Sequence, residues 1–531
     1  MQNLNLTTIT IIIIGVIALF YGLYKISRYA FVLNAILIIG CFFGLFIIDR
    51  RITVFSKSVL MFGCPLFFMN LLMYVFLHEK GLSPNSKDMY KVHFKIKRGR
   101  LNIQNIKRGA SIIGSAGSGK TESVVYNFLQ HFSKYSFSGV IHDYKDFEIT
   151  EMAYPLFKAQ NIPFYVVSFD TIYHRVNPIA PRYIENEESV NEVSRVLIEN
   201  LLEQKESGTS SSSKFFTDAA EGLIGGLIWK LKTTYPKYCT LPHLIAIYQH
   251  LDTDSLIAFL ESNKTAKGMA SAFISGKDSD RQTAGVKSTL ANALKKISTK
   301  RIFMVLSADD VPLAINTEET PGVISVVNYP KFETAYTPLI ATIVHTITKQ
   351  MSIRHRKPSF LLMEEASTIR LLNMHRIPAT LRSYNIATVY VMQNKVQNDI
   401  MYGDKASKAI LSNLSYQFFG KVNDPDTAKY YERFFELIKM ETTSINKGHN
   451  LNFDTRVTKG EKEVSKVRAD TFFKLKPGEF ISFTDGEDRK IQFQLQTIQK
   501  GLPKVKHRYA KKDIKRNFKR IYREAHSLFG K

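Results

Sequence analysis

The 531-residue sequence is poor in cysteine, with only three such residues. Cys41 and Cys64 lie in apolar stretches near the N-terminus, and Cys239 stands alone. Neither the paired spacing of a zinc site nor the regular spacing of a disulfide framework is present. The sequence therefore excludes a disulfide-stapled scaffold, and it fits a protein whose bulk lies in a reducing compartment.

Acidic residues are also scarce relative to basic ones, with 47 Asp and Glu against 72 Lys and Arg. The net charge of +25 indicates a polyanionic partner, either nucleic acid or anionic lipid, unless it serves solubility alone. Residues 1–80 hold six basic and two acidic residues, so +4 lies there and +21 in the rest of the chain. This uneven distribution favours a polyanion over solubility alone.

Charge is absent from three long apolar runs near the N-terminus, residues 7–24, 30–48 and 58–77. Each run approaches the roughly 20 residues that a helix needs to cross the hydrocarbon core of a bilayer. No cationic stretch precedes the first run and no small-residue cleavage site follows it, so a signal peptide is a poor interpretation. We predict a multi-pass transmembrane anchor over residues 1–80, with two or three helices.

The short loops between these runs do not determine the orientation of the anchor. Lys25 and Arg28 lie in the first loop, and Arg50, Arg51 and Lys57 lie in the second. Cytoplasmic loops prefer Lys and Arg, but both loops cannot be inside if all three runs span the membrane. With three spans and a cytoplasmic C-terminal part the N-terminus would be outside. With two spans, one run would lie in the interface.

A glycine-rich turn in residues 109–132 lies between an apolar strand and a helical pattern. It matches G-x-x-x-x-G-K-[ST], in which backbone N–H groups and the start of the following helix bind phosphates. Lys120 would contact the β- and γ-phosphates of ATP, and Thr121 would hold Mg²⁺. The loop consists of Gly114, Ser115, Ala116, Gly117, Ser118, Gly119, Lys120 and Thr121.

A second apolar strand, in residues 359–368, ends in the adjacent acids Glu364 and Glu365. A P-loop needs such a partner. Glu364 would bind Mg²⁺ through its water shell, and Glu365 would polarise the attacking water. The usual order at such sites is Asp-Glu, and Glu364 is one methylene longer. The alternative interpretation is a solvated acidic helix start.

Three further polar residues are candidates for the same chemistry. The apolar strand in residues 386–397 ends at Gln393, which can reach the γ-phosphate or the attacking water, or simply cap the strand. Arg382 can project into a neighbouring subunit's site and stabilise charge in the transition state, and Lys405 can act likewise. The alternative for these two cations is a surface salt bridge.

These motifs, in this order, resemble the type IV secretion coupling proteins, the TraG/TraD-like ATPases of conjugation systems. The family's strand followed by Asp-Pro-Lys-Gly-Glu is similar to residues 139–148, where Tyr144 replaces the proline and Asp146 the glycine. Its Asn-Pro-Leu turn, the start of its inserted helical domain and its strand before a helix beginning Asp-x-x-Thr-Ala are similar to residues 174–180, 215–231 and 410–435.

The resemblance implies a RecA-like motor that forms a homohexamer and hydrolyses ATP with Mg²⁺. It would sit in the bacterial inner (cytoplasmic) membrane, in contact with membrane lipid, with its ATPase domain in the cytoplasm. It would link single-stranded DNA and relaxase proteins to components of a type IV secretion channel.

The alternation of strand-like and helical segments predicts an α/β fold with a mainly parallel sheet. We expect a RecA-like P-loop domain interrupted by an all-α insertion, because the pattern between residues 184 and 300 is almost wholly helical. Strand-like runs include residues 301–307. The expected division is an anchor over 1–80, RecA-like parts over 81–183 and 301–499, the insertion over 184–300, and a basic tail over 500–531.

The tail contains twelve Lys or Arg against two acids in residues 500–531. Its apolar residues recur at spacings of three and four, which predicts an amphipathic basic helix. Such a helix can bind DNA phosphates, anionic lipid or an acidic partner. The apolar positions are Ile514, Phe518, Ile521, Ala525 and Leu528.

Two other functions fit parts of the sequence. The first is an FtsK-like double-stranded DNA translocase, which shares an anchor and a RecA-like motor. The helical insertion between the P-loop and the acidic strand argues against it. The second is a non-catalytic membrane adaptor that binds nucleotide structurally and recruits DNA-bound cargo, a reading that the Glu364–Glu365 pair allows.

Overall fold

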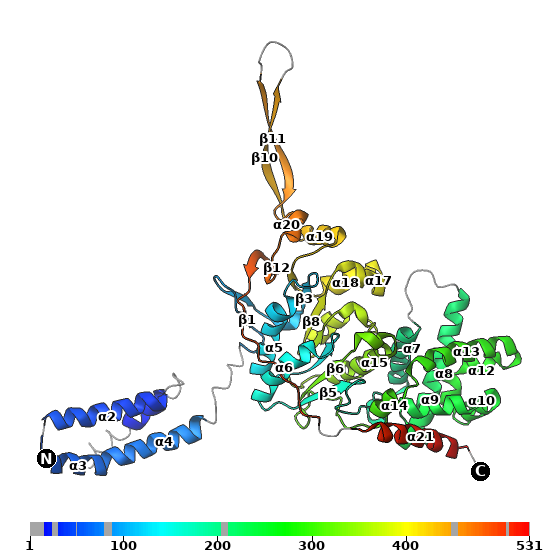
Figure 1. The fold of residues 1–531 in the computed structure, drawn as a ribbon, viewed down its shortest axis with the longest axis horizontal. Helices are drawn as coiled ribbons and strands as arrows, with labels where there is room; N and C mark the ends of the chain where they lie inside the picture. Colours follow the sequence, from blue (N-terminus) through cyan, green and yellow to red (C-terminus); the bar gives the residue numbers. More distant parts are fainter. Residues whose placement is uncertain are drawn as a thin grey trace. The chain divides into compact units, whose positions relative to one another are not determined.

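The computed structural model divides the chain into two compact units, one ending at Met89 and the other beginning at Tyr90 (Figure 1). Each unit is described by itself. The structure describes residues 15–23, 30–48, 50–78, 88–202, 211–447, 455–505 and 509–529.

The N-terminal unit is helical, as the apolar runs predict. Two of its helices are long and apolar enough to cross a membrane, Ala30–Ile48 and Ile52–Tyr74. The second begins six residues before the expected run, so it also takes in Lys57. The first predicted run, 7–24, lies largely outside the described residues, and only its part 15–23 is described, as helix. The elements are α2 (Ala30–Ile48), α3 (Ile52–Ser58), a π-helical turn (Val59–Gly63) and α4 (Cys64–His78).

Two buried asparagines connect α2 to α4. Asn34 Nδ2 donates a hydrogen bond to Asn70 Oδ1 at 3.1 Å, and Asn70 Nδ2 donates to the carbonyl of Phe31 at 3.1 Å. Most other residues of these helices are exposed apolar side chains. Polar side chains that bond across apolar helices fix their register, because an unpaired amide in hydrocarbon is costly.

The second unit is built on a nine-stranded sheet in the order β13-β12-β9-β3-β8-β7-β4-β6-β5. The strands from β9 through β3 to β5 are parallel, and β12 and β13 add an antiparallel edge. This confirms the expected α/β class. The strands are β3 (Ala110–Ile113), β4 (Ser138–Asp143), β5 (Phe164–Ser168), β6 (Val323–Val327), β7 (Ser359–Met363), β8 (Ile386–Met392), β9 (Tyr416–Phe419), β12 (Glu479–Thr484) and β13 (Glu487–Gln492).

Helices cover both faces of this sheet, as a buried parallel sheet requires. On one face, aromatic rings join α5 and α6 to β7, with Phe132 stacked on Phe360 at a centroid distance of 4.4 Å. On the other face, α15 contacts β4 and β6. The helices next to the sheet are α5 (Tyr126–Lys134), α6 (Glu148–Ala159), α15 (Glu333–Met351), α16 (Ile377–Arg382), α17 (Lys395–Tyr402), α18 (Asp404–Ser412) and α19 (Pro425–Glu432).

A helical cluster is inserted between β5 and β6, beyond the β5 edge of the sheet (Figure 1). The prediction of a strand over residues 301–307 is wrong, because that run forms α14. Thr299 caps the first turn of this helix. Its apolar residues are buried against other helices rather than in the sheet. The cluster contains α7 (Glu187–Leu201), α8 (Ser211–Thr234), α9 (Leu241–His250), α10 (Thr253–Glu261), α11 (Lys264–Met269), α12 (Ser271–Ile274), α13 (Asp280–Ile297) and α14 (Lys300–Leu306).

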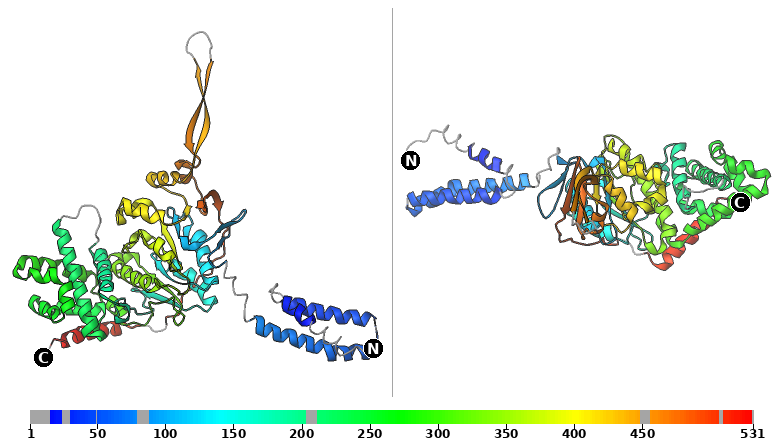
Figure 2. Two further views of the ribbon diagram at one scale, coloured as in Figure 1. Left: turned by 180° about the vertical axis from the view of Figure 1, so that it is seen from behind. Right: turned by 90° about the horizontal axis from the view of Figure 1, so that it is seen from above.

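Two antiparallel hairpins and two late helices complete the unit. The hairpin of β10 and β11 projects away from the sheet in Figure 1 and in the left view of Figure 2. The basic tail forms the expected helix, α21, which packs on α9 and α14. These elements are β1 (Val92–Phe94), β2 (Leu101–Ile103), β10 (Leu437–Lys447), β11 (Thr455–Ser465), α20 (Ala469–Phe473) and α21 (Lys511–Ser527).

Candidate functional site

The glycine-rich loop connects the carboxyl end of β3 to a π-helical segment, Lys120–Val125, that continues into α5. Gly117 and Gly119 have φ angles of 73° and 85°, values that L side chains rarely adopt. A Cβ on Gly119 would also lie 2.9 Å from the backbone nitrogen of Gly478. Glycine at position 119 is therefore required both by conformation and by the close approach of a second loop.

The loop lysine is buried and turned back onto the loop. Lys120 Nζ donates hydrogen bonds to the carbonyls of Gly114 and Ser115, the second at 3.2 Å. Burial lowers the pKa of Lys120, and the charge of Glu365 opposes that shift. The ammonium thus lies within electrostatic reach of the acidic strand end while it is held by the loop's own backbone.

The two candidate acids follow β7, and both are almost fully buried, with exposed fractions of 1% and 2%. Glu364 accepts a hydrogen bond from the backbone N–H of Tyr144 at 3.1 Å. Glu365 has a φ of 44°, an unusual conformation for a residue other than glycine, and this turn re-aims its side chain. Gln393 Nε2 donates to Glu365 Oε1 at 3.0 Å. The strand order explains the contact, because β8 lies between β3 and β7.

A cation lies between the two carboxylates. Lys145 Nζ is 3.3 Å from Glu364 Oε1 and 3.2 Å from Glu365 Oε1. Burial lowers the pKa of Lys145, but the charges of Glu364 and Glu365 outweigh it, so the net shift is upward. Burial, with the charge of Asp143, raises the pKa of Glu364. Lys145 is therefore the group that compensates the buried negative charge.

The segment that carries Lys145 is itself held by β4. The Asp143 carboxylate is buried and accepts hydrogen bonds from the backbone N–H of Thr150, at 2.7 Å, and from its hydroxyl. Tyr144 places its hydroxyl 3.2 Å from Glu333 Oε2, at the start of α15. The turn after β4 is thereby fixed at both sides, and Lys145 projects from it toward the end of β7.

An open cavity of 340 Å³ borders Glu365. Its wall joins residues from the turns after β4, β7 and β8, which is where ligands bind in open α/β sheets. These residues are Tyr144, Glu333, Glu365, Ser367, Thr368, Gln393, Gln397, Ile400 and Met401.

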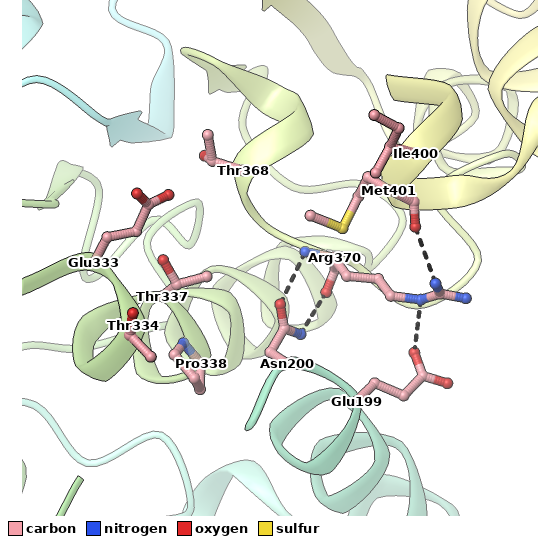
Figure 3. Close-up of a pocket in the computed structure, with 10 residues that line it drawn as sticks. All are labelled: Glu199, Asn200, Glu333, Thr334, Thr337, Pro338, Thr368, Arg370, Ile400 and Met401. Carbon is pink, nitrogen blue, oxygen red and sulfur yellow. Dashed lines mark hydrogen bonds and ion pairs between the residues drawn. The ribbon is translucent and has the colours of Figure 1, made fainter. Parts of the chain in front are cut away.

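A second cavity, of 260 Å³, shares Glu333, Thr368, Ile400 and Met401 with the first and extends to α7 (Figure 3). Along its wall, Arg370 joins three parts of the chain. Its Nε donates to Glu199 Oε2 at 3.1 Å, and its Nη1 donates to the carbonyl of Met401 at 3.0 Å (Figure 3).

The backbone of Arg370 is held as firmly as its side chain. Asn200 accepts from the backbone N–H of Arg370 at 3.0 Å and donates to its carbonyl at 2.8 Å (Figure 3). Tyr402 makes an equivalent bracket, since its hydroxyl donates to the carbonyl of Ile369 and accepts from the N–H of Leu371. The segment after Glu365 is therefore tied both to α7 of the helical cluster and to α17, which follows Gln393.

The sequence-predicted residues fall into two groups. The charges of Glu364 and Glu365 act on Lys120, and Gln393 bonds to Glu365, so these four lie together, with Thr121 next to Lys120. Arg382 does not join them.

Arg382 is exposed and ends α16, whereas Gln393 follows β8, so the two lie at opposite ends of that strand. Burial and the charge of Arg382 together lower the pKa of Lys107. A role for Arg382 in phosphate chemistry therefore requires the site of a neighbouring subunit and stays a prediction.

Sequence reasoning missed Lys145 and Arg370. The signal for Lys145 was present, because it follows an apolar strand just as Glu364 and Gln393 do, and the carboxyl ends of parallel strands converge. No local signal marks Arg370, since its partners Glu199 and Asn200 are about 170 residues away in the chain.

Comparison with known proteins decides the family. The model of the family described as type IV secretory system conjugative DNA transfer matches residues 79–488, more than half of the chain. The chain belongs to this conjugative DNA transfer family. The FtsK-like alternative is accordingly set aside. A comparison with curated proteins found no sequence match.

Solved structures agree on the fold of this family member. The bacterial conjugative coupling protein TrwBdeltaN70 is similar with a TM-score of 0.59 and 13% identity, over 77% of this chain and 90% of that one. TrwB with the ATP analogue ADPNP matches at 0.58 and 13%, over 75% and 87% of the two chains. TrwB with ADP and Mg²⁺ matches at 0.58 and 13%, over 74% and 86%.

The hydrogen bonds that join Arg370 to Glu199, Asn200 and Met401, here called the Arg370 bracket, lead to a prediction about local stability. Arg370→Ala removes two hydrogen bonds of a charged donor, so amide exchange in residues 366–371 is expected to accelerate about 30-fold, equivalent to about 2 kcal/mol. Hydrogen–deuterium exchange by mass spectrometry measures this. The control is Lys408→Ala, which removes an exposed ion pair with Asp404 and should change exchange there less than about fivefold. Equal, small effects at both sites would contradict the bracket.

Proposed function

We propose that the chain is a membrane-anchored ATPase that couples a relaxase–DNA substrate to a type IV secretion channel in conjugative DNA transfer. One observation supports the ATPase part of the proposal. The buried P-loop lysine, the carboxylates after β7 and Gln393 after β8 lie together at the carboxyl ends of neighbouring strands. Membership of the conjugative DNA transfer family carries the coupling part.

The residues present fit ATP and Mg²⁺. TrwB has been solved with the ATP analogue ADPNP and with ADP and Mg²⁺. Among the described residues, the buried Ser118 Oγ accepts no hydrogen bond, and Glu364 Oε1 has no partner beyond its ion pair with Lys145. Mg²⁺ binds through one or two carboxylates together with substrate phosphates and water, which suits Thr121 and Glu364. When bound, Mg²⁺ would neutralise charge on the phosphates.

Each residue of the site then has a distinct task. The loop from Gly114 to Thr121 would hold the phosphates through backbone N–H groups, and Lys120 would leave its carbonyl partners for the β- and γ-phosphates. Glu365 would accept the proton of the attacking water, and Gln393, already bonded to it, would orient that water. Lys145 would exchange its contact with the two acids for the incoming phosphate charge.

The remaining assignments extend this proposal to the assembly. We propose a homohexamer in the bacterial inner membrane, anchored by the apolar helices of the first unit, with the ATPase part in the cytoplasm. The two apolar helices support membrane association by length and composition. The expected divisions, with RecA-like parts at 81–183 and 301–499 around an all-α insertion at 184–300, belong to the same proposal, except that α14 is assigned to the insertion because it packs on α9.

Two substitutions test the hydrolytic site. Lys120→Ala removes the phosphate contact, so ATP hydrolysis is expected to be lost. Glu365→Gln removes the base, so turnover should fall at least about tenfold while the protein still binds ATP. Phosphate release and filter binding of labelled ATP measure the two effects. Lys474→Ala, an exposed lysine, is the control. Turnover surviving in Lys120→Ala would refute the site. A non-catalytic adaptor would bind ATP without any turnover in the unmodified protein.

Mixing experiments test Arg382. Separately, Arg382→Ala and Lys120→Ala proteins are both expected to be inactive, but their mixture should regain part of the activity, because each supplies what its neighbour's site lacks. ATPase rate against mixing ratio is the measurement. A mixture of Lys120→Ala with Glu365→Gln should regain nothing, since both residues belong to one chain's site. Absence of recovery in the first mixture would place Arg382 outside catalysis.

The coupling role is tested by conjugation. Deletion of the gene from a donor strain is expected to abolish transfer of its mobile DNA, and the unmodified gene supplied in trans should restore it. The Lys120→Ala gene should not. Normal transfer without the protein would assign it to another process.

A further inference from the structure

We propose that the exposed face of α21 binds the phosphate backbone of DNA, and that the helical cluster serves as its rigid support. This inference rests on the proposed function and deepens it, because it names where the chain contacts its polyanionic substrate. It follows from how α21 is docked, from which charges remain outside, and from the groups that the outer face lacks.

The apolar face of α21 packs against the core of the chain. Ile521 and Ala525 are buried, and the ring of Phe518 lies 4.9 Å from that of Phe303 on α14. Tyr522 is stacked on Phe303 and donates its hydroxyl to Gln249 at 2.6 Å. Amphipathic helices bind membranes by burying this face in lipid. A docked α21 cannot do so, and only its polar side is left for a partner.

The two acidic residues of the helix are also engaged internally. Asp513 accepts from the backbone N–H of Ala510 at 3.1 Å, at the start of the helix. Glu524 Oε2 lies 3.0 Å from His243 Nε2 on α9 and also pairs with Arg520. Both carboxylates are thus bonded within the chain, and both are half-buried.

What the outer face presents is two rows of cations. Residues four apart lie on one side of a helix and about 6 Å apart along its axis. Of the seven Lys and Arg residues in these rows, only Arg520 forms an ion pair with a carboxylate among the described residues. The first row is Lys511, Lys515, Lys519 and Arg523, and the second is Lys512, Arg516 and Arg520, all exposed.

Such rows oppose helix formation, since like charges four residues apart destabilise an isolated helix. Packing on α9 and α14 offsets that repulsion, and a polyanion laid along the rows would remove it. Figures 1 and 2 show α21 on the outside of the helical cluster, with its length open to solvent. The surface is thus preformed, and binding does not require the helix to fold.

The chemistry of the face favours phosphate rather than bases. Its exposed residues include no tryptophan, tyrosine or phenylalanine, so it has no platform on which bases could stack. Lys and Arg contacts to phosphates position nucleic acid without reading its sequence. We therefore expect affinity that depends strongly on salt and little on sequence.

The test uses the full-length protein in detergent and a fluorescently labelled single-stranded oligonucleotide of mixed sequence. Three substitutions in one row, Lys515→Gln, Lys519→Gln and Arg523→Gln, remove up to three phosphate contacts. The slope of log affinity against log salt should then fall by about 2, because each contact contributes about 0.7. Fluorescence anisotropy over a salt series measures it, and at low salt we expect affinity to drop at least tenfold.

Matched controls separate the α21 face from total charge and from folding. The triple variant Lys134→Gln, Lys158→Gln and Lys474→Gln removes the same charge from exposed positions elsewhere and should keep the slope. The triple variant Lys515→Arg, Lys519→Arg and Arg523→Lys keeps the charge and should bind normally. Basal ATP hydrolysis without DNA should be unchanged in all three, which reports that the motor is folded.

Several outcomes would overturn the proposal. An unchanged salt slope in the first variant would do so, as would an equal loss in the second. Loss of binding to phosphatidylglycerol vesicles with DNA binding intact would assign the face to lipid headgroups. If α21 behaves as proposed while Lys120→Ala still hydrolyses ATP, the DNA surface stands and the proposed catalytic site fails. If only α21 fails, the motor assignment is untouched.

Discussion

Two carboxylates buried side by side at the end of β7 constrain everything around them. Glu364 and Glu365 are almost without solvent, and adjacent buried charges of one sign are tolerated only when a cation and hydrogen-bond donors compensate them. Lys145 supplies the cation, and Gln393 and the backbone of Tyr144 supply the donors. The turns after β4, β7 and β8 must therefore keep a fixed mutual geometry.

The same constraint gives the site two possible charge states. With Lys145 between them, one cation faces two carboxyl groups, and burial together with the charge of Asp143 raises the pKa of Glu364, which favours its neutral form. In the proposed reaction, phosphates and Mg²⁺ bring new charge of both signs, and Lys120 and Lys145 both have contacts that they can exchange for phosphate. Because Lys120 is buried on two loop carbonyls and Lys145 pairs with two buried acids, each lysine can leave its present contacts only when phosphate and Mg²⁺ replace them.

Changes at the acids have a physical route to the helical cluster. Arg370 lies five residues after Glu365 and is bonded to Glu199 and Asn200 on α7, and its guanidinium also reaches Met401 on α17. The α21 helix packs on that same cluster through α9 and α14. The proposed phosphate-binding face and the proposed hydrolytic site are thus linked through packed helices rather than through a mobile linker.

Sequence alone determined the features whose information is local. The P-loop pattern, the strands ending in Glu364–Glu365 and Gln393, and the amphipathic period of the tail are each contained in a few neighbouring residues, and the structure has each element where it was expected. The run at residues 301–307 was misjudged, because a short apolar stretch fits a strand or a buried helix equally well.

Only the tertiary structure decided which of these elements meet. Three pairings join residues 170 to 281 positions apart, and no period in the sequence encodes them. They are those of Lys145 with the acids, of Arg370 with α7 and of Glu524 with His243. The tail shows the consequence most clearly. Its sequence left lipid, DNA and an acidic partner open, and the docking of its apolar face removed membrane insertion while leaving seven cations outside. Burial of one face decides what the other face can bind, and burial is a property of the folded chain.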